Sequence, residues 1–327
     1  MIAVTGALGF IGSAFVWELN QKGEKNIVCV DAVELKDRPA PLQKRSYSKF
    51  LNHKSFLDEL SAGAIKPRWV VHMGACSTTT ETNAAYLKEV NLDYSIELFK
   101  ACTKHKIPLI YASSAAVYGL GDKGYSDEQT AKDYVPLNLY GKSKKDFDCW
   151  VEEQSEFPPY WYGLRFFNVY GPNEAHKQDM RSLVCKAYSQ IQSASSLKLF
   201  KSNHPDFRDG EQKRDFVYVK DVTKWMLELM TPALGKAEVA KNGIYNMGSG
   251  TARTWLDLAR SCFKNLNKEF KINWIEIPDN IKNQYQNFTE ADMNKWFSAG
   301  LSKPKYSLEK GVTDYIQTNL KPGIEYL

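Results

Sequence analysis

A glycine-rich turn directly after the first apolar segment constrains this fold more than any other feature of the chain. Gly6, Gly9 and Gly12 lie in the run 4–12, between an expected strand over 1–5 and an expected helix over 10–22. Glycines at this spacing permit a tight turn, close approach to a pyrophosphate, and close helix–sheet packing. The helix N-terminus then directs its free amides and positive dipole end at the phosphates. The turn therefore predicts a dinucleotide site.

A carboxylate follows at the distance that such a site requires. The second apolar run, over 26–30, ends at Asp31, which lies nineteen residues beyond Gly12. This is where a ribose-binding acid is expected in a βαβ unit. A glycine triplet alone is a weak signal, because such turns serve many structural purposes. Together with Asp31, however, it predicts a dinucleotide-binding βαβ unit.

Composition indicates a globular α/β chain that does not cross a membrane. The chain has 327 residues, 43% of them hydrophobic, and no apolar stretch of about 18 residues. The first strand leaves no room for a secretory signal, so we expect a cytoplasmic protein. The six cysteines include no C-x-x-C pair, and we expect neither a metal site nor a disulfide framework.

Charge favours a small anionic substrate over nucleic acid. The formal net charge is only +5, and basic and acidic residues are interspersed along the chain. A nucleic-acid-binding domain would more often show a concentrated basic patch. Scattered surface lysines are the simpler alternative explanation for the excess.

Alternating apolar and helical segments predict the architecture. Apolar runs over 68–73, 107–113 and 162–169 are separated by helical patterns over 83–105 and 140–153. This order is typical of a Rossmann-type doubly wound parallel sheet with helices on both faces. After about residue 170 glycines and prolines recur and a polar loop follows over 201–213. We therefore predict a dinucleotide-binding domain of 1–169 with 214–245 returning to it, and a smaller substrate lobe of 170–213 and 246–327.

Tyr140 and Lys144 are the most reactive pair that the sequence suggests. They are four residues apart at the start of an expected helix, so they share one face. A neighbouring ammonium stabilises a phenolate, and we expect it to lower the pKa of Tyr140. Ser114, at the end of the apolar run 107–113, could hydrogen-bond a reacting oxygen. A surface tyrosine beside a solvated lysine is the alternative for the pair.

The glycine turn, Ser114 and the Tyr140–Lys144 pair, in this order, resemble the extended short-chain dehydrogenase/reductase family. The segments 165–172 and 213–219 occur in many members of that family. Three further segments, 74–79, His176-Lys177 and 285–292, resemble more particularly its ADP-L-glycero-D-manno-heptose 6-epimerase branch. The resemblance extends from residue 1 to about residue 315.

This resemblance implies an isomerase that supplies a heptose precursor of the lipopolysaccharide core. Bound NADP would oxidise the C-6 hydroxyl of the heptose to a ketone and return the hydride to the opposite face, with no net redox change. Such chemistry needs an acid/base on each side of the carbon. The resemblance assigns these roles to Tyr140 and Lys177, although Lys177 alone could be a surface lysine. It also implies a homo-oligomer.

For the cofactor, the resemblance implies backbone amides of Phe10 and Ile11 at the pyrophosphate, Lys144 on the nicotinamide ribose, and Asn91 supporting the loop 73–77. Asp31 usually favours NAD, yet the branch accommodates NADP with lysines nearby, for which Lys36, Arg38 and Lys54 are candidates. The implied cofactor residues are Gly6, Gly9, Phe10, Ile11, Gly12, Asp31, Ala32, Lys36, Lys54, Met73, Gly74, Ala75, Cys76, Ser77, Asn91, Lys144, Val169 and Lys177.

For the nucleotide sugar, the chain partly departs from the branch. Asp179 stands where the branch has Ser, Lys186 where it has His, and 202–213 is longer by about six residues, a length that surface loops tolerate. We expect Asp179 to face the sugar hydroxyls or solvent. The candidate substrate residues are Asn168, Asp179, Lys186, Phe200, Lys201, Ser202, Asn203, Arg214 and Tyr285.

Three other functions use the same fold. A 4-epimerase on a different nucleotide sugar needs only Ser114, Tyr140 and Lys144, so it is the main alternative. A 4,6-dehydratase typically needs an Asp-Glu pair after Ser114, where this chain has Ala115-Ala116. A cofactor-binding scaffold without catalysis is possible on fold alone, but it would not need the Tyr–Lys pair.

Overall fold

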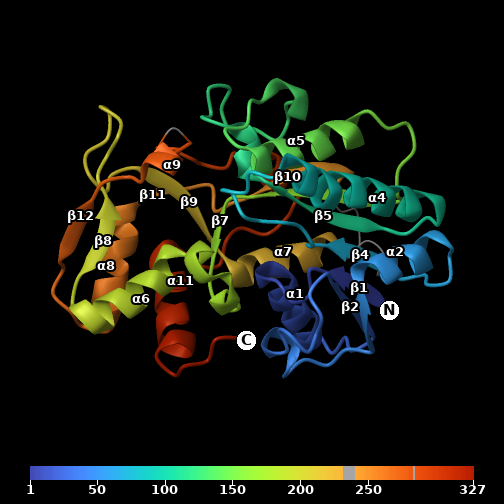
Figure 1. Cartoon of the computed structure of the whole chain (residues 1–327), viewed down its shortest axis with the longest axis horizontal. Coiled ribbons are helices and arrows are strands. Elements are labelled where there is room, and N and C mark those ends of the chain that lie inside the picture. Colours follow the sequence, from blue (N-terminus) through green and yellow to red (C-terminus); the bar gives the residue numbers. More distant parts are fainter. Residues whose placement is uncertain (231–239, 283) are drawn as a thin grey trace.

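A parallel sheet of seven strands forms the centre of the structure, a computed structural model that describes residues 1–230, 240–282 and 284–327 (Figure 1). The order across the sheet is β10-β6-β5-β4-β1-β2-β3. The strands are β1 (Ile2–Thr5), β2 (Ile27–Asp31), β3 (Lys49–Asn52), β4 (Trp69–His72), β5 (Leu109–Ser114), β6 (Trp161–Phe166) and β10 (Gly243–Met247). The predicted doubly wound fold is confirmed.

Helices cover both faces of this sheet, and the alternation of side chains along each strand explains why. In β1, Val4 packs with α1 (Phe10–Gln21) and α7 (Val219–Leu229) on one face. Its neighbour Ala3 points to the other face, toward α2 (His53–Ser61), α4 (Tyr94–Lys104) and α5 (Leu139–Glu152). Strands buried on both sides read as continuous apolar runs.

The chain leaves β1 in two directions, which opens a crevice at one edge of the sheet. Connections run from β1 outward to β2 and β3, and then back across to β4 and β5. Ligands of doubly wound sheets bind at the carboxyl ends of the strands at this point of reversal. The registers Thr5↔Val30 and Thr5↔His72 place the ends of β1, β2 and β4 together at that edge.

The helix expected over 83–105 is interrupted in the structure. It consists of α3 (Ala84–Leu87), a π-helical segment Lys88–Asp93, and α4. π-helical turns within longer helices are frequent at functional sites. Asn91 lies in this segment, where its side chain turns inward and is fully buried.

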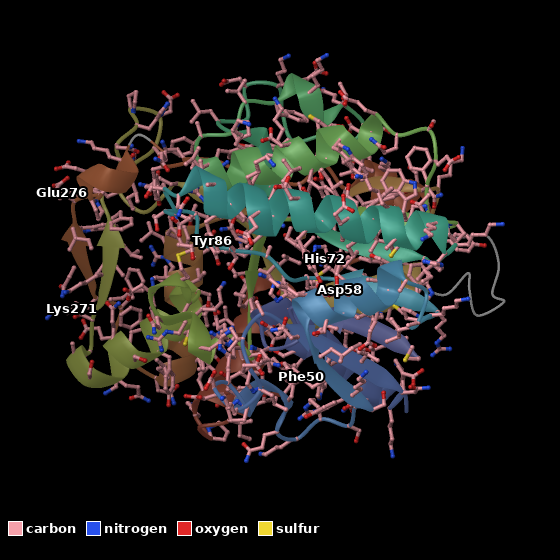
Figure 2. The ribbon with its side chains drawn as sticks, turned by 45° about the vertical axis from the view of Figure 1, so that its right-hand side comes forward. Phe50, Asp58, His72, Tyr86, Lys271 and Glu276 are labelled. Atoms are coloured by element: carbon pink, nitrogen blue, oxygen red, sulfur yellow. The ribbon has the colours of Figure 1, made fainter. Side chains whose placement is uncertain are left out.

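The smaller lobe is built around two further sheets. One has the order β11-β9-β7 and the other pairs β12 with β8. Figure 2 shows Lys271 and Glu276, which flank β12, on the outer side of this lobe. Its strands are β7 (Asn168–Tyr170), β8 (Leu197–Phe200), β9 (Lys213–Tyr218), β11 (Ala252–Thr254) and β12 (Ile272–Ile275). Its helices are α6 (Leu183–Ala194), α8 (Trp255–Leu266), α9 (Asp279–Lys282) and α11 (Leu308–Tyr315). Helix α10 (Asn294–Ser298) instead packs against β10 of the large sheet, where Trp296 contacts Trp225 and Tyr245.

The described part of 214–245 adjoins both lobes. Within 214–245, α7 packs on α1 and β10 pairs with β6, so both adjoin the large sheet. Strand β9, by contrast, pairs with β7 and β11 in the small lobe. Residues 231–239 of this predicted return lie outside the described residues. No described helix is both long and apolar enough to span a membrane.

Candidate active site

A cavity of about 1420 Å³ runs from the carboxyl edge of the large sheet into the small lobe. This exceeds the roughly 300–1,000 Å³ of a usual single-ligand pocket, so two ligands fit side by side. The glycine turn and Asp31 line one end of it. Phe200, Trp255 and Tyr285 line the other end.

The glycine turn forms a cradle that side chains would fill. Gly6 has φ +64°, and a Cβ there would lie 2.7 Å from the backbone nitrogen of Gly74. A Cβ at Gly12 would lie 2.1 Å from the carbonyl oxygen of Gly6. Gly9 precedes α1 without any capping side chain, so the amides of Phe10 and Ile11 stay open to the cavity. These features fit a dinucleotide pyrophosphate.

Asp31 is held by backbone amides at the end of β2. Its Oδ2 accepts a hydrogen bond from Leu8 N at 2.9 Å and its Oδ1 accepts one from Val33 N at 3.1 Å. Ala32, Arg38 and Lys54 line the cavity beside it. Lys36 is exposed and does not line the cavity, because its side chain extends to solvent from the loop after β2. Of the three predicted cations, Arg38 and Lys54 line the cavity.

The loop 73–77 after β4 lines the cavity with every one of its residues. Two hydrogen bonds from the Asn91 side chain hold this loop in place: Oδ1 accepts from Cys76 N at 2.8 Å, and Nδ2 donates to Cys76 O at 3.1 Å. Nδ2 also lies 3.0 Å from Ser143 Oγ in α5. Asn91 does not line the cavity itself, so it would act on a cofactor only through the loop.

Ser114, Tyr140 and Lys144 meet at the wall of the cavity. Tyr140 hydrogen-bonds the hydroxyl of Ser114, which also accepts from Ala116 N at 3.1 Å. The Nζ of Lys144, which is 4% exposed, donates to Ala112 O at 2.9 Å. The sequence therefore correctly predicted that these three residues lie together. Ser114 is at the end of β5, and Tyr140 and Lys144 are in the first turns of α5.

The protonation of this group differs from the prediction. Burial raises the pKa of Tyr140, and the Ser114 hydrogen bond only partly opposes this effect. Burial lowers the pKa of Lys144 to about 8, against the charge of Asp148. The expectation that Lys144 lowers the pKa of Tyr140 is wrong for this structure. The ammonium is directed at Ala112 O, and desolvation of the phenolate dominates.

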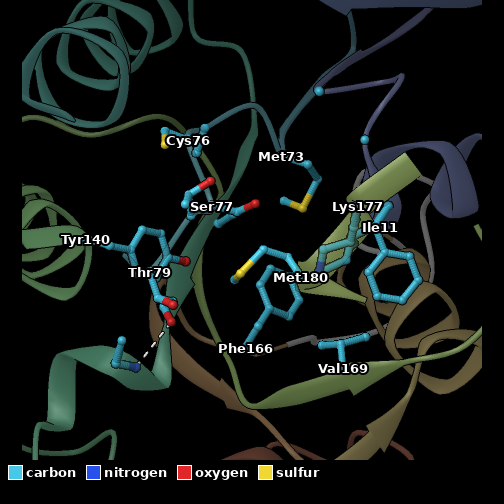
Figure 3. Close-up of a pocket in the computed structure, with 18 of the residues that line it drawn as sticks. Ile11, Met73, Cys76, Ser77, Thr79, Tyr140, Phe166, Val169, Lys177 and Met180 are labelled. Atoms are coloured by element: carbon cyan, nitrogen blue, oxygen red, sulfur yellow. Dashed lines mark hydrogen bonds between the residues drawn. The ribbon is translucent and has the colours of Figure 1, made fainter. Parts of the chain in front are cut away.

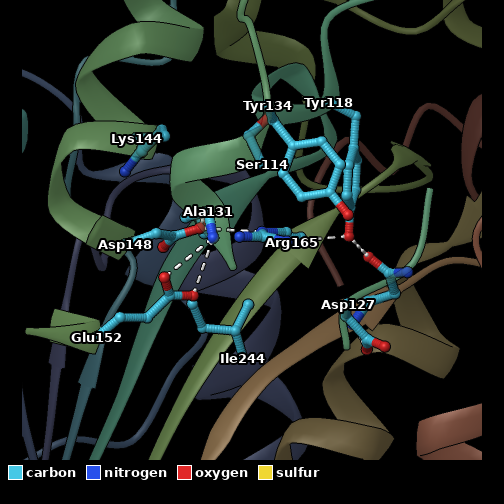
Figure 4. Close-up of polar contacts among 12 residues, drawn as sticks. Ser114, Tyr118, Asp127, Ala131, Tyr134, Lys144, Asp148, Glu152, Arg165 and Ile244 are labelled. Carbon is cyan, nitrogen blue, oxygen red and sulfur yellow. Dashed lines mark hydrogen bonds and ion pairs between the residues drawn. The ribbon is translucent and has the colours of Figure 1, made fainter. Parts of the chain in front are cut away.

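A buried ion pair lies beneath Lys144 that the sequence reading missed (Figure 4). Arg165 Nε donates to Asp148 Oδ2 at 3.0 Å, and both side chains are fully buried. Ser113 Oγ donates to the same carboxylate at 2.9 Å, and Tyr118 OH lies 3.2 Å from Arg165 Nη1. Asp148 follows Lys144 by four residues on α5, a spacing that could have indicated their common face.

Lys177 lies across the cavity from Tyr140 (Figure 3). Its Nζ is 5.2 Å from the centre of the Phe10 ring at the start of α1. Burial lowers the pKa of Lys177, the carboxylate of Glu174 raises it, and Lys186 lowers it. A lysine with a lowered pKa exchanges protons more readily near neutral pH. Its neighbour His176 stacks on Tyr326, and burial lowers the pKa of that imidazole to about 4.

The predicted substrate residues fall into two groups. Asn168, Lys186, Phe200 and Tyr285 line the cavity, as does the predicted cofactor residue Val169. The others do not line it, and they are Asp179, Lys201, Ser202, Asn203 and Arg214.

Local contacts explain the second group. Asp179 is exposed, consistent with its expected solvent-facing alternative. Lys201 pairs with Glu276 at 2.6 Å, because the chain turns outward after β8. Ser202 and Asn203 bond to Asp209 and to a carbonyl of α9. Arg214 is buried behind Tyr285, whose ring lies 5.0 Å from the guanidinium.

Several cavity residues were not predicted. Phe216 comes from β9 and Trp255 from the start of α8, Gln286 follows Tyr285, and Arg181 and Lys198 come from the small lobe. These residues belong to separate segments without a common spacing. Only the folded structure therefore identifies them as cavity residues.

Comparison with known proteins places this site in a family. Residues 2–248 match the NAD dependent epimerase/dehydratase family. Over 100% of both chains, the sequence is 43% identical to the ADP-L-glycero-D-manno-heptose-6-epimerase of Fusobacterium nucleatum subsp. nucleatum. The chain belongs to the family of the ADP-L-glycero-D-manno-heptose-6-epimerases. Another member of this family, from Nitratidesulfovibrio vulgaris strain Hildenborough, is 44% identical over 100% of both chains.

Solved structures agree with the family and the fold. The heptose-6-epimerase of Helicobacter pylori superposes with a TM-score of 0.80 at 27% identity, covering 99% of this chain and 95% of that one. A UDP-glucuronic acid 4-epimerase from Bacillus cereus, solved with UDP-glucuronic acid and NAD, has a TM-score of 0.75 at 24% identity over 97% and 99%. At that identity the second match shows the fold alone. The family is one of epimerases, which are isomerases, and the resemblance seen in the sequence is confirmed.

Proposed function

We propose that the chain interconverts ADP-D-glycero-D-manno-heptose and ADP-L-glycero-D-manno-heptose by inverting C-6 of the heptose. The observation that carries this proposal is the placement of two acid/base groups, Tyr140 and Lys177, on opposite sides of one cavity beside the glycine cradle. Inversion at a carbinol carbon needs proton exchange with an oxygen that points in two different directions. The printed names of the relatives support the same substrate.

Each residue has a defined task in this reaction. One of Tyr140 and Lys177 accepts the proton of the C-6 hydroxyl while the carbon loses hydride, which leaves a ketone. The sugar then presents its other face, the carbon regains the hydride, and the second residue donates a proton to the oxygen. The nicotinamide cofactor, when bound, supplies the site that accepts and returns this hydride. Ser114 holds the reacting oxygen beside Tyr140, and Lys144 fixes the ribose of the cofactor.

NADP is the proposed cofactor, within a family that is NAD dependent by description. Asp31 by itself favours the free 2′-hydroxyl of NAD. Arg38 and Lys54, however, line the same cavity as Asp31 and can meet a 2′-phosphate. We expect Arg38→Ala and Lys54→Ala to weaken binding of NADP more than binding of NAD, measured by fluorescence titration. Equal weakening of both would favour NAD.

A nucleotide sugar is the proposed small-molecule partner, and the Lys186 and Arg181 side chains at the cavity wall are cations suited to a diphosphate. The heptose product would serve lipopolysaccharide core synthesis. The homo-oligomer and the cytoplasmic location stay predictions.

Proton NMR of the purified protein with ADP-D-glycero-D-manno-heptose and no added cofactor tests the proposal. We expect signals of the C-6 epimer, because a co-purified cofactor is regenerated in every turnover. Lys177→Ala should lose most of the rate, whereas Lys224→Ala, at an exposed lysine of α7 outside the cavity, should retain it. A 4-epimerase acting on another sugar would barely respond to Lys177→Ala. No epimer after addition of NADP and NAD would contradict the substrate.

A further inference from the structure

The short segment before Lys177 is among the most completely buried polar parts of the molecule. Asn173 and Glu174 are both 0% exposed, and the turn Ala175–Met180 follows them directly. Lys177 N donates to Glu174 O at 3.0 Å, so Glu174 begins the turn that presents Lys177. Burying a carboxylate costs free energy unless hydrogen bonds or an opposite charge compensate it. The contacts of Glu174 therefore indicate what its burial serves.

Glu174 joins this turn to two helices of the small lobe. Its Oε2 accepts from Ser182 N at 2.5 Å, and its Oε1 accepts from Ser182 Oγ at 2.6 Å. Tyr315, at the end of α11, hydrogen-bonds the same carboxylate. Ser182 Oγ in turn accepts from Cys185 N, so its own proton is free to go to Glu174. Burial raises the pKa of Glu174, whereas the hydrogen bonds from Ser182 and Tyr315 and the charge of Lys177 oppose this shift because they favour the ionised form.

The charge of Glu174 also reaches Lys177. The carboxylate raises the pKa of Lys177, while burial and Lys186 lower it. Glu174 belongs to the same turn as Lys177, Lys186 comes from α6, and the uncharged Phe10 ring comes from α1. His176, on the same turn, is uncharged near neutral pH because burial, Arg38 and Lys177 lower its pKa to about 4.

Asn173 fixes the opposite side of the same segment. Its Nδ2 lies 3.0 Å from Ser13 Oγ in α1, and its Oδ1 accepts from Leu327 N at 2.7 Å. Adjacent residues therefore fasten the turn to the large domain and to the small lobe. The turn bearing Lys177 is thus held from both sides, by Ser182 and Tyr315 of the small lobe and by Ser13 of the large domain.

We propose that Glu174 is the positioning residue of Lys177. It anchors the turn to α6 and α11, and its buried negative charge favours the protonated form of the Lys177 amine. This inference rests on the proposed role of Lys177 as the second acid/base. Glu174 does not line the cavity, so it acts through Lys177 alone.

The test compares pH profiles of kcat for epimerisation by the holoenzyme. In Glu174→Gln the limb that belongs to Lys177 should move to lower pH by about one unit, because a nearby negative charge is lost. In Lys186→Gln the same limb should move to higher pH. Glu174→Gln should also lower kcat about tenfold with KM nearly unchanged, because the turn loses an anchor.

Asp221→Asn is the matched control for burial. Asp221 is 2% exposed and accepts from Lys305 N and Tyr306 N, both at 3.0 Å, so it also ties two segments together. It lies on α7, outside the cavity. We expect this variant to lose stability while both limbs of the pH profile stay in place.

The outcomes separate this inference from the proposed function. If Lys177→Ala keeps the wild-type rate, the role of Lys177 itself is wrong. If Lys177→Ala abolishes the rate but Glu174→Gln shows the wild-type limbs and kcat, only the role of Glu174 is overturned. If Glu174→Gln does not fold, Glu174→Asp is used instead. This variant keeps the carboxylate, but its side chain is shorter by one methylene, so the charge lies farther from Ser182 and Lys177. A lower kcat with a smaller shift in the same direction supports the inference, and a wild-type profile refutes it.

Discussion

Lys144→Met should alter the pH dependence of stability in a way that reports the burial of the lysine charge. Lys144 is almost fully buried, and desolvation lowers its pKa from 10.5 to about 8. A difference of this size corresponds to about 3 kcal/mol of free energy. The native cofactor-free protein thus bears an unfavourable charge at neutral pH, which methionine removes at similar volume.

The hydrogen bond to Ala112 O sets the opposing effect. Methionine leaves this buried carbonyl oxygen without its donor, at a cost of about 1–3 kcal/mol. At about pH 7 the cofactor-free variant should therefore be more stable than wild type by about 1 kcal/mol. Between the folded pKa and 10.5 the unfolded chain holds a proton that the native lysine has lost, so wild-type stability rises with pH. The advantage of the variant should shrink by about 2 kcal/mol from about pH 7 to about pH 9.5.

Urea unfolding of cofactor-free protein at several pH values measures this difference, and NMR epimerisation assays check that activity is lost. Lys142→Met is the control, because Lys142 lies on the same helix but is exposed and pairs with Asp146. That variant should stay within about 0.5 kcal/mol of wild type at every pH. A stability difference for Lys144→Met that does not change with pH would refute the reasoning.

Three other substitutions have sharp expectations. Gly12→Ala should abolish cofactor retention, seen as loss of co-purified nicotinamide absorbance, because its Cβ would lie 2.1 Å from Gly6 O; full retention would contradict the cradle. Asn91→Ala should destabilise the protein by about 2 kcal/mol and weaken cofactor affinity about tenfold, because Cys76 loses both hydrogen bonds; unchanged titration and unfolding curves would exclude a role in the loop. Asp179→Ser should leave kcat and KM unchanged, because Asp179 is exposed outside the cavity, and a raised KM would place it in the substrate site.

Features that depend on local spacing were predictable from the sequence. The turn with Gly6 and Gly12, the carboxylate of Asp31 and the pair Tyr140–Lys144 all lie where their intervals predict. Each is fixed by the geometry of one strand–turn–helix unit or of one helical face. Such units keep their internal geometry in the folded chain.

Features that depend on tertiary packing were not predictable. Arg214 has the right chemistry for a diphosphate, but the fold buries it behind Tyr285, and only Phe200 of the expected wall 200–203 lines the cavity. The direction of the Tyr140 pKa shift likewise depends on desolvation, which spacing does not reveal. The π-helical segment at Asn91 was also not predictable, and in the structure Asn91 accepts a hydrogen bond from Cys76 N.

Asn173 also bears on how long a bound dinucleotide stays. It has φ +79° and links α1, which starts at the glycine cradle, with the C-terminal segment at Leu327. The turn that follows it brings Lys177 over Phe10, the first residue of that helix. Moving this turn away from the cradle would therefore break the buried hydrogen bond between Asn173 and Ser13 and the part-buried one between Asn173 and Leu327. We therefore expect a bound dinucleotide to dissociate slowly, which suits an enzyme whose hydride carrier ends each turnover in the state in which it began.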